Sequence, residues 1–133
     1  MKYIIDTHIL IWLAVSPEKV PKRIMEIIEE PTNTICISTI SLWEIAIKLA
    51  IKKLELKNLD IEDLVEICHE QDIKIMQLPI SAVKQYKSLP IKPNHKDPFD
   101  RILISLCICE DYVFLSSDTK IGQYKENGLI FVN

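Results

Sequence analysis

Short apolar runs recur along the chain between segments in which apolar residues are spaced as in helices. Five of these runs are strand-sized, covering residues 2–5, 34–38, 73–78, 113–115 and 129–132. Their near-continuous hydrophobicity is typical of parallel strands buried on both faces of a sheet. We therefore predict five strands in a central sheet.

Helices are predicted between the strands, where apolar residues recur three or four positions apart. After an apolar turn at residues 9–13, Ser16-Pro17-Glu18 has the N-cap, proline and acid of a helix start, and Pro31 ends that helix. The remaining helices are predicted over residues 41–53, 60–71, 79–89 and 99–109, with the longest loop at 90–96.

The alternation of strands and helices, with connections too long for hairpins, indicates βαβ units and a largely parallel sheet covered on both faces. A chain of 133 residues has room for one such core. In sheets of this kind, ligands bind beyond the carboxyl ends of the strands. We therefore look for functional residues at that edge.

Composition narrows the function classes. With 48% hydrophobic residues, the chain is not expected to be disordered. Its net charge of −3 excludes binding to nucleic acid through a general positive charge of the protein. Two glycines are too few for a Gly-rich phosphate loop. The cysteines form no C-x-x-C pair, and no signal peptide or membrane span is visible, so we expect a cytoplasmic protein with no membrane association.

Four carboxylates stand where the predicted elements meet the carboxyl edge. Asp6 ends the first strand and Asp118 follows the fourth, while Glu44 and Asp100 lie in the first turns of helices. Crowded carboxylates raise each other's pKa unless a cation compensates them, and Mg²⁺ or Mn²⁺ prefers such oxygen ligands. Convergence of the four would therefore imply a metal site.

Helix capping is the simpler explanation for three of these acids. Ser41 and Glu44 have the spacing of a capping box, and Asp100 follows an Asp97-Pro98 helix start. Asp118 could also be a cap. Asp6 differs, because a charged residue that closes a buried strand is poorly explained by solvation.

Four segments carry a resemblance to a known family: Tyr3-Ile-Ile-Asp-Thr-His8, Ser41-Leu-Trp-Glu-Ile-Ala-Ile-Lys48, His95-Lys-Asp-Pro-Phe-Asp-Arg-Ile-Leu-Ile104 and Leu115-Ser-Ser-Asp118. In this order they resemble the PIN-domain proteins, in particular the VapC-type toxins of bacterial and archaeal toxin–antitoxin pairs. The resemblance spans nearly the whole chain. The Asp-Pro-Phe-Asp-Arg and Ser-x-Trp-Glu blocks are specific to one subgroup.

The resemblance implies a single PIN-like nuclease domain over residues 1–133, built as a three-layer α/β/α sandwich around a mainly parallel five-stranded sheet. It also implies a Mg²⁺- or Mn²⁺-dependent endoribonuclease toxin, with an RNA substrate, a small antitoxin partner and a homodimeric state. The catalytic and metal-binding positions fall on four acids: Asp6, Glu44, Asp100 and Asp118. The hydroxyl positions, which we expect to contact the substrate, fall on Thr7 and Ser116.

Within this scheme the acids would hold a metal that would supply activation of water to hydroxide and a clamp on the scissile phosphate. Asp6 and Asp100 are the first candidates as ligands, while Glu44 and Asp118 bind a second ion or orient the water. Asp97 stays ambiguous, because its spacing makes it a helix cap close to the acids.

A basic loop lies next to these acids in the sequence. Lys92, Lys96 and Arg101 are candidates for binding the RNA backbone, and the alternative is a solvated loop. His95 is disfavoured as a metal ligand because no His or Cys lies at zinc spacing from it. We expect Trp12 and Trp43 to pack in the core or at an interface rather than to stack on bases.

Surplus apolar residues at 9–15 and 42–51 suggest a dimer contact or an antitoxin groove. Two other functions remain open. One is a catalytically inactive PIN module that binds RNA or protein. The other is a metal-dependent 5′-nuclease or phosphatase, although the Asp-x-Asp motif of one phosphatase class is absent at Asp6-Thr7-His8.

Overall fold

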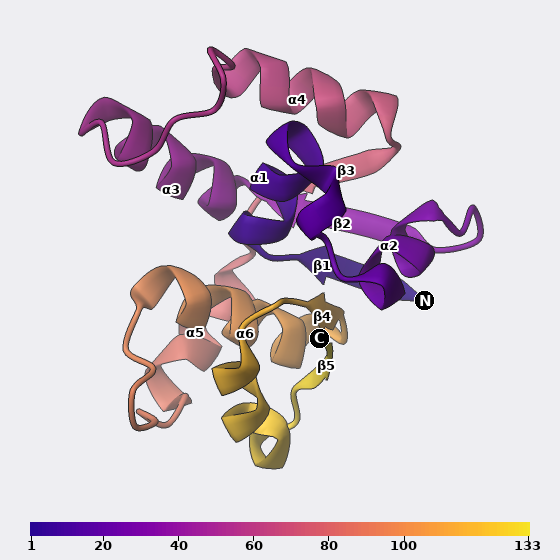
Figure 1. The fold of residues 1–133 in the computed structure, drawn as a ribbon. Coiled ribbons are helices and arrows are strands. Elements are labelled where there is room, and N and C mark those ends of the chain that lie inside the picture. The colour runs from indigo at the N-terminus through magenta and orange to yellow at the C-terminus, as the bar shows by residue number, and fades with distance from the viewer.

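The computed structural model describes residues 1–133 as a five-stranded sheet with helices on both faces (Figure 1). The strand order is β3-β2-β1-β4-β5, and all neighbouring strands are parallel. The strands are β1 (Lys2–Ile5), β2 (Thr34–Ser38), β3 (Ile73–Met76), β4 (Val113–Leu115) and β5 (Ile130–Val132). The predicted α/β class, a three-layer sandwich around a parallel five-stranded sheet, is confirmed.

Helices form the two outer layers. They are α1 (Thr7–Val15), α2 (Lys22–Glu29), α3 (Thr39–Ala50), α4 (Ile61–Glu70), α5 (Ile80–Ser88) and α6 (Pro98–Glu110), with 3₁₀ segments η1 (Pro17–Lys19) and η2 (Thr119–Asn127). Helices α1 to α4 contribute to one apolar core, and α5, α6 and η2 to the other (Figure 1). No helix combines the length and the apolar character needed to cross a membrane.

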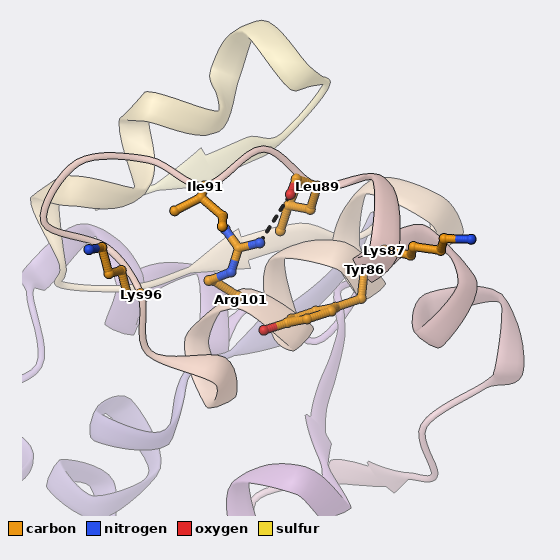
Figure 2. A pocket seen from close by; sticks show the side chains of 6 residues that line it. All are labelled: Tyr86, Lys87, Leu89, Ile91, Lys96 and Arg101. Atoms are coloured by element: carbon orange, nitrogen blue, oxygen red, sulfur yellow. Dashed lines mark hydrogen bonds between the residues drawn. The ribbon is translucent and has the colours of Figure 1, made fainter.

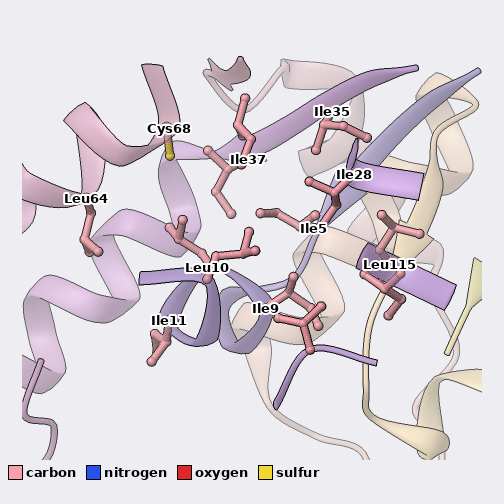
Figure 3. Packing of buried hydrophobic residues seen from close by; sticks show 14 of the residues in the cluster. Ile5, Ile9, Leu10, Ile11, Ile28, Ile35, Ile37, Leu64, Cys68 and Leu115 are labelled. Carbon is pink, nitrogen blue, oxygen red and sulfur yellow. The ribbon is translucent and has the colours of Figure 1, made fainter. Parts of the chain in front are cut away.

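Alternation along the strands divides the core into two layers. Ile5 joins the cluster beneath α1 to α4, and its neighbour Ile4 joins the cluster beneath α5 and α6. In the first layer, Leu64 and Cys68 descend from α4 toward Ile37 of β2 (Figure 3). Because successive side chains of a strand point to opposite faces, a strand without polar positions requires cover on both sides.

The N-terminal helices differ from the prediction. The expected apolar turn is the nine-residue helix α1, which Asp6 caps by accepting a hydrogen bond from the Ile9 amide at 2.8 Å. The helix expected to start at Ser16 is interrupted, because Pro21 precedes α2 and Ser16 makes no side-chain capping bond. A helix that is apolar on all sides shows no periodicity, which explains why α1 looked like a turn.

Two further boundaries were wrong. Helix α3 starts at Thr39 rather than Ser41, because the Ser38 side chain accepts a hydrogen bond from the Ile40 amide at 3.1 Å. Segment η2 was not predicted, and its N-cap is Asp118. These starts place both caps directly after the carboxyl ends of β2 and β4.

Removing a buried side chain from one layer should destabilise the whole fold. We expect Ile4→Ala to lower the free energy of unfolding by about 2–5 kcal/mol, because it leaves a cavity between β1 and α6. Ile130 on the edge strand is 64% exposed, so Ile130→Ala should cost less than about 1 kcal/mol. Urea denaturation of both variants measures the difference, and equal losses would contradict this assignment of the core.

Candidate active site

The four predicted carboxylates meet at the carboxyl edge of the sheet. Asp6 follows β1 and Asp118 lies just beyond β4, its neighbour in the sheet. Glu44 comes from the second turn of α3 and Asp100 from the first turn of α6, and these two helices pack against each other. The charges of the other three acids all act on Asp100, so the four form one electrostatic cluster, which we call the acidic rim.

Asp6 is almost fully enclosed within the acidic rim, with 4% of its surface exposed. One carboxylate oxygen accepts the Ile9 amide, and the other accepts the Ser116 hydroxyl. Burial raises the pKa of Asp6, while these two hydrogen bonds oppose the rise. The carboxylate is therefore held in one orientation before any ligand arrives.

Glu44 is also buried, and both of its oxygens are engaged. Oε1 accepts the Thr7 hydroxyl at 2.8 Å, and Oε2 pairs with Lys48 one turn later at 2.9 Å. It does not return a hydrogen bond to Ser41, because α3 begins two residues earlier than predicted. The capping-box interpretation of Glu44 is therefore wrong.

The surroundings of Asp100 disfavour the charged form of its carboxyl group. Burial, followed by the charges of Asp97, Glu44, Asp6 and Asp118, raises the pKa of Asp100 to about 7. Asp97 caps α6 by accepting the Phe99 amide at 2.8 Å, as its spacing predicted. Its charge nevertheless reaches Asp100, so Asp97 combines the cap with an electrostatic influence on the rim.

Asp118 has two roles at once. Its Oδ1 accepts the Lys120 amide at 2.9 Å and caps η2. Its Oδ2 faces the imidazole of His95, with Nε2 at 3.5 Å. Capping therefore uses one oxygen and leaves the other for the rim.

His95 is the site residue that the sequence reasoning set aside. It is 3% exposed, and its Nε2 lies 3.5 Å from Asp118 and 3.8 Å from Asp100. Ligand atoms of these three residues lie within 4.8 Å of one another, close enough to hold a metal ion. Burial lowers the pKa of His95, which favours the neutral ring. A search for zinc spacing missed it because its neighbours are carboxylates, not His or Cys, and one of them, Asp118, is distant in the sequence.

The two predicted hydroxyl residues are buried and support the acids. Thr7 lies within hydrogen-bonding distance of both Glu44 and Ser41, and Ser116 donates to Asp6. Both side chains lie in the wall of the site. Their predicted contact with substrate stays a prediction.

The side chain of Arg101 is buried rather than exposed to solvent, where RNA could contact it. Only 5% exposed, its guanidinium donates to the carbonyls of Pro90 and Leu89 at 2.8 and 3.0 Å and to the Tyr124 hydroxyl at 3.1 Å (Figure 2). These hydrogen bonds occupy the guanidinium group of Arg101 and hold the loop that follows α5. The structure therefore does not present Arg101 as a free cation for RNA.

The predicted basic cluster is correspondingly divided. Lys92 pairs with Glu126, whereas Lys96 is exposed. Lys96 lines a pocket of about 460 Å³ with Arg101, and Lys87 lies on the opposite side of that arginine (Figure 2). Lys96 is thus the freest of the three predicted cations beside the rim.

An apolar groove runs beside the acidic rim. It measures about 350 Å³ and is lined by Ile40, Trp43, Val83, Tyr86, Pro98, Phe99 and Ile102. Trp43 is 58% exposed and meets Phe99 edge to face at 5.4 Å between ring centroids, so it packs at the surface and not in the core. By contrast, most apolar residues of α1 are buried in the core, which leaves few of them for an interface.

Comparisons with known proteins agree with this geometry. A family model for the PIN domain matches residues 3–127. VapBC2 from Rickettsia felis, bound to a DNA fragment from its promoter, superposes with a TM-score of 0.68 at 21% identity, covering 100% of this chain and 98% of that one. VapBC-1 from nontypeable Haemophilus influenzae gives 0.66 at 18% identity, with coverage of 100% and 98%. No curated protein matches the chain.

Neutralising Asp100 should stabilise the metal-free protein. Its folded-state pKa of about 7 exceeds the ordinary 3.8, so ionisation opposes folding and wild-type stability should fall as the pH rises from about 4 to 7. After a discount for the 31% exposure of this side chain, we expect Asp100→Asn to gain about 1–3 kcal/mol at pH 8. Denaturation in EDTA at pH 4 and pH 8 tests this.

Asp72→Asn is the matched control, because Asp72 precedes β3 at the opposite edge of the sheet. A gain for Asp100→Asn that is as large at pH 4 as at pH 8 would show that the carboxylate charge is not its cause.

Arg101 should contribute more to stability than Lys96 does. Arg101→Lys replaces a planar, three-bonded guanidinium with a point charge, and we expect a loss of about 1–3 kcal/mol. Lys96→Ala removes an exposed charge and should change stability by less than about 0.5 kcal/mol. Thermal denaturation separates the two, and a neutral Arg101→Lys would contradict the anchoring role.

Proposed function

This chain belongs to the PIN domain family, and we propose that it is a Mg²⁺- or Mn²⁺-dependent endoribonuclease that acts as the toxin of a toxin–antitoxin pair. The observation that carries the proposal is the acidic rim itself. Four carboxylates crowd together, and the pKa of Asp100 rises to about 7. Such an arrangement is unfavourable without a cation, which makes metal binding the best explanation of its presence.

The donor set fits a divalent ion. Asp6, Asp100, Glu44 and Asp118 offer carboxylate oxygens, the ligands that Mg²⁺ and Mn²⁺ prefer. The orphaned Nε2 of His95 faces the same space. When bound, the ion supplies a Lewis acid that activates water and offsets charge on a phosphodiester.

The protein residues supply orientation. Ser116 and the Ile9 amide hold Asp6, and Thr7 holds Glu44. Preorganised groups of this kind need not reorganise when charge develops during reaction. The arrangement therefore suits hydrolysis of a phosphodiester that is brought to the rim.

RNA binding is assigned to local groups, since the chain has a net charge of −3. Lys96 is the first candidate for the backbone, and Lys92 can join it only by leaving Glu126. Thr7 and Ser116 are proposed to line the approach to the scissile phosphate. Arg101 contributes by holding the loop that carries Lys96.

The apolar groove is the proposed antitoxin site. Its lining is almost entirely hydrophobic, and Trp43 is exposed at its edge, as expected for a surface covered by a partner. Solved structures with this fold include VapBC assemblies. We propose that a small antitoxin inserts an apolar segment there, and that the toxin also forms a homodimer.

Asp6→Asn should abolish RNA cleavage. The amide can still accept the Ile9 hydrogen bond that caps α1, so the fold should persist while the charge for metal binding is lost. We expect activity on structured RNA with Mg²⁺ or Mn²⁺ to fall at least ~100-fold, and EDTA to have the same effect on the wild type.

Asp60→Asn is the matched control, because Asp60 caps α4 through a capping box and does not belong to the rim. Full activity of Asp6→Asn, or activity that resists EDTA, would overturn the proposed mechanism. RNA binding without cleavage would favour an inactive binding module, and cuts confined to 5′ ends would favour the 5′-nuclease alternative.

A further inference from the structure

The Nε2 atom of His95 is a buried polar atom without a hydrogen-bond partner. The side chain is 3% exposed, and Nε2 points at Asp118 and Asp100 across 3.5 and 3.8 Å. Those distances are too long for hydrogen bonds. They match the separation of about 3–4 Å between neighbouring ligands of one ion whose bonds are about 2.1 Å long.

The other ring nitrogen of His95, Nδ1, has a hydrogen-bond partner. Nδ1 lies 2.9 Å from the Tyr124 hydroxyl, which also accepts a hydrogen bond from Arg101 and lies 3.5 Å from the carbonyl of His95. When Nδ1 carries the ring proton, it donates to the Tyr124 hydroxyl oxygen, which also accepts from Arg101. This tautomer leaves the lone pair of Nε2 directed at the acidic rim.

Such an arrangement is typical of histidine that binds metal. A metal-binding imidazole usually donates its second ring N–H to a protein group, which fixes both the tautomer and the ring orientation. Here Tyr124 is that group, and Arg101 fixes Tyr124 in turn. The chain of contacts explains why a buried histidine faces carboxylates without bonding to them.

We propose that His95 Nε2 is a metal ligand, and that with Asp100 and Asp118 it forms a mixed nitrogen and oxygen site that prefers Mn²⁺ to Mg²⁺. Mg²⁺ retains waters and takes oxygen ligands, whereas an imidazole nitrogen favours transition-metal ions. The inference rests on the proposed function, because it concerns the metal of the same rim.

Pulsed electron paramagnetic resonance of Mn²⁺ bound to the full-length protein tests the ligand directly. Coordination by imidazole nitrogen modulates the electron spin echo, so the wild-type complex should show this signal. His95→Gln should remove the signal and weaken Mn²⁺ binding about 10- to 100-fold. Because Mg²⁺ binding should weaken less, the preference for Mn²⁺ should fall about 10-fold in calorimetric titrations.

The other two histidines of the chain provide matched controls. His8→Gln and His69→Gln each remove an exposed imidazole, and both should keep the nitrogen signal. Together they assign the signal to His95 even if His95→Gln fails to fold. Tyr124→Phe should retain the signal but weaken Mn²⁺ binding about 10-fold, because Nδ1 loses its partner.

The outcomes separate this inference from the proposed function. Mn²⁺ that binds without an imidazole signal, or a signal that is lost with His8 or His69, overturns the role of His95 alone. Failure of the wild type to bind Mn²⁺ overturns both. A nitrogen signal from His95 in a protein that cleaves no RNA supports the ligand and contradicts the nuclease proposal.

Discussion

Repulsion among carboxylates at the carboxyl edge of β1 and β4 is the constraint around which this structure is built. The parallel sheet brings Asp6 and Asp118 together, and the starts of α3 and α6 add Glu44 and Asp100. Hydrogen bonds from the wall fix some of these charges, but burial, followed by the charges of the neighbouring acids, still raises the pKa of Asp100. The fold tolerates the remaining unfavourable energy of these charges because the two apolar layers that enclose the sheet stabilise it.

Helix capping places two of the acids, Asp6 and Asp118, at this edge. In a parallel α/β sheet, helices begin just beyond strand ends, so N-cap residues gather where ligands bind. Asp6 and Asp118 each give one oxygen to a backbone amide and direct the other elsewhere, toward Ser116 and His95 respectively. Capping and chemistry are therefore not alternatives here, since a carboxylate has two oxygens and can do both.

Local patterns predicted the strands and the acids, but not the residues whose environment is set by distant contacts. The strand runs and the edge position of Asp6 follow from hydrophobicity alone. Helix α1 was missed because it is apolar on all sides, and Glu44 was misread because a cap at Ser38 shifts the start of α3. The burial of Arg101 depends on Tyr124, which lies 23 residues away, a distance that no periodicity can bridge.

Arg101 and His95 show how such a contact changes the meaning of a residue. As a sequence feature, Arg101 completes a basic loop; in the structure its guanidinium binds two loop carbonyls and the Tyr124 hydroxyl. That hydroxyl meets His95, whose free nitrogen faces the acidic rim. The charge of Arg101 thus positions the site, and under the proposed function attraction of the RNA backbone falls to exposed lysines and to the bound ion. A protein with a net charge of −3 can approach nucleic acid in this way only when the negative charge of the rim is compensated.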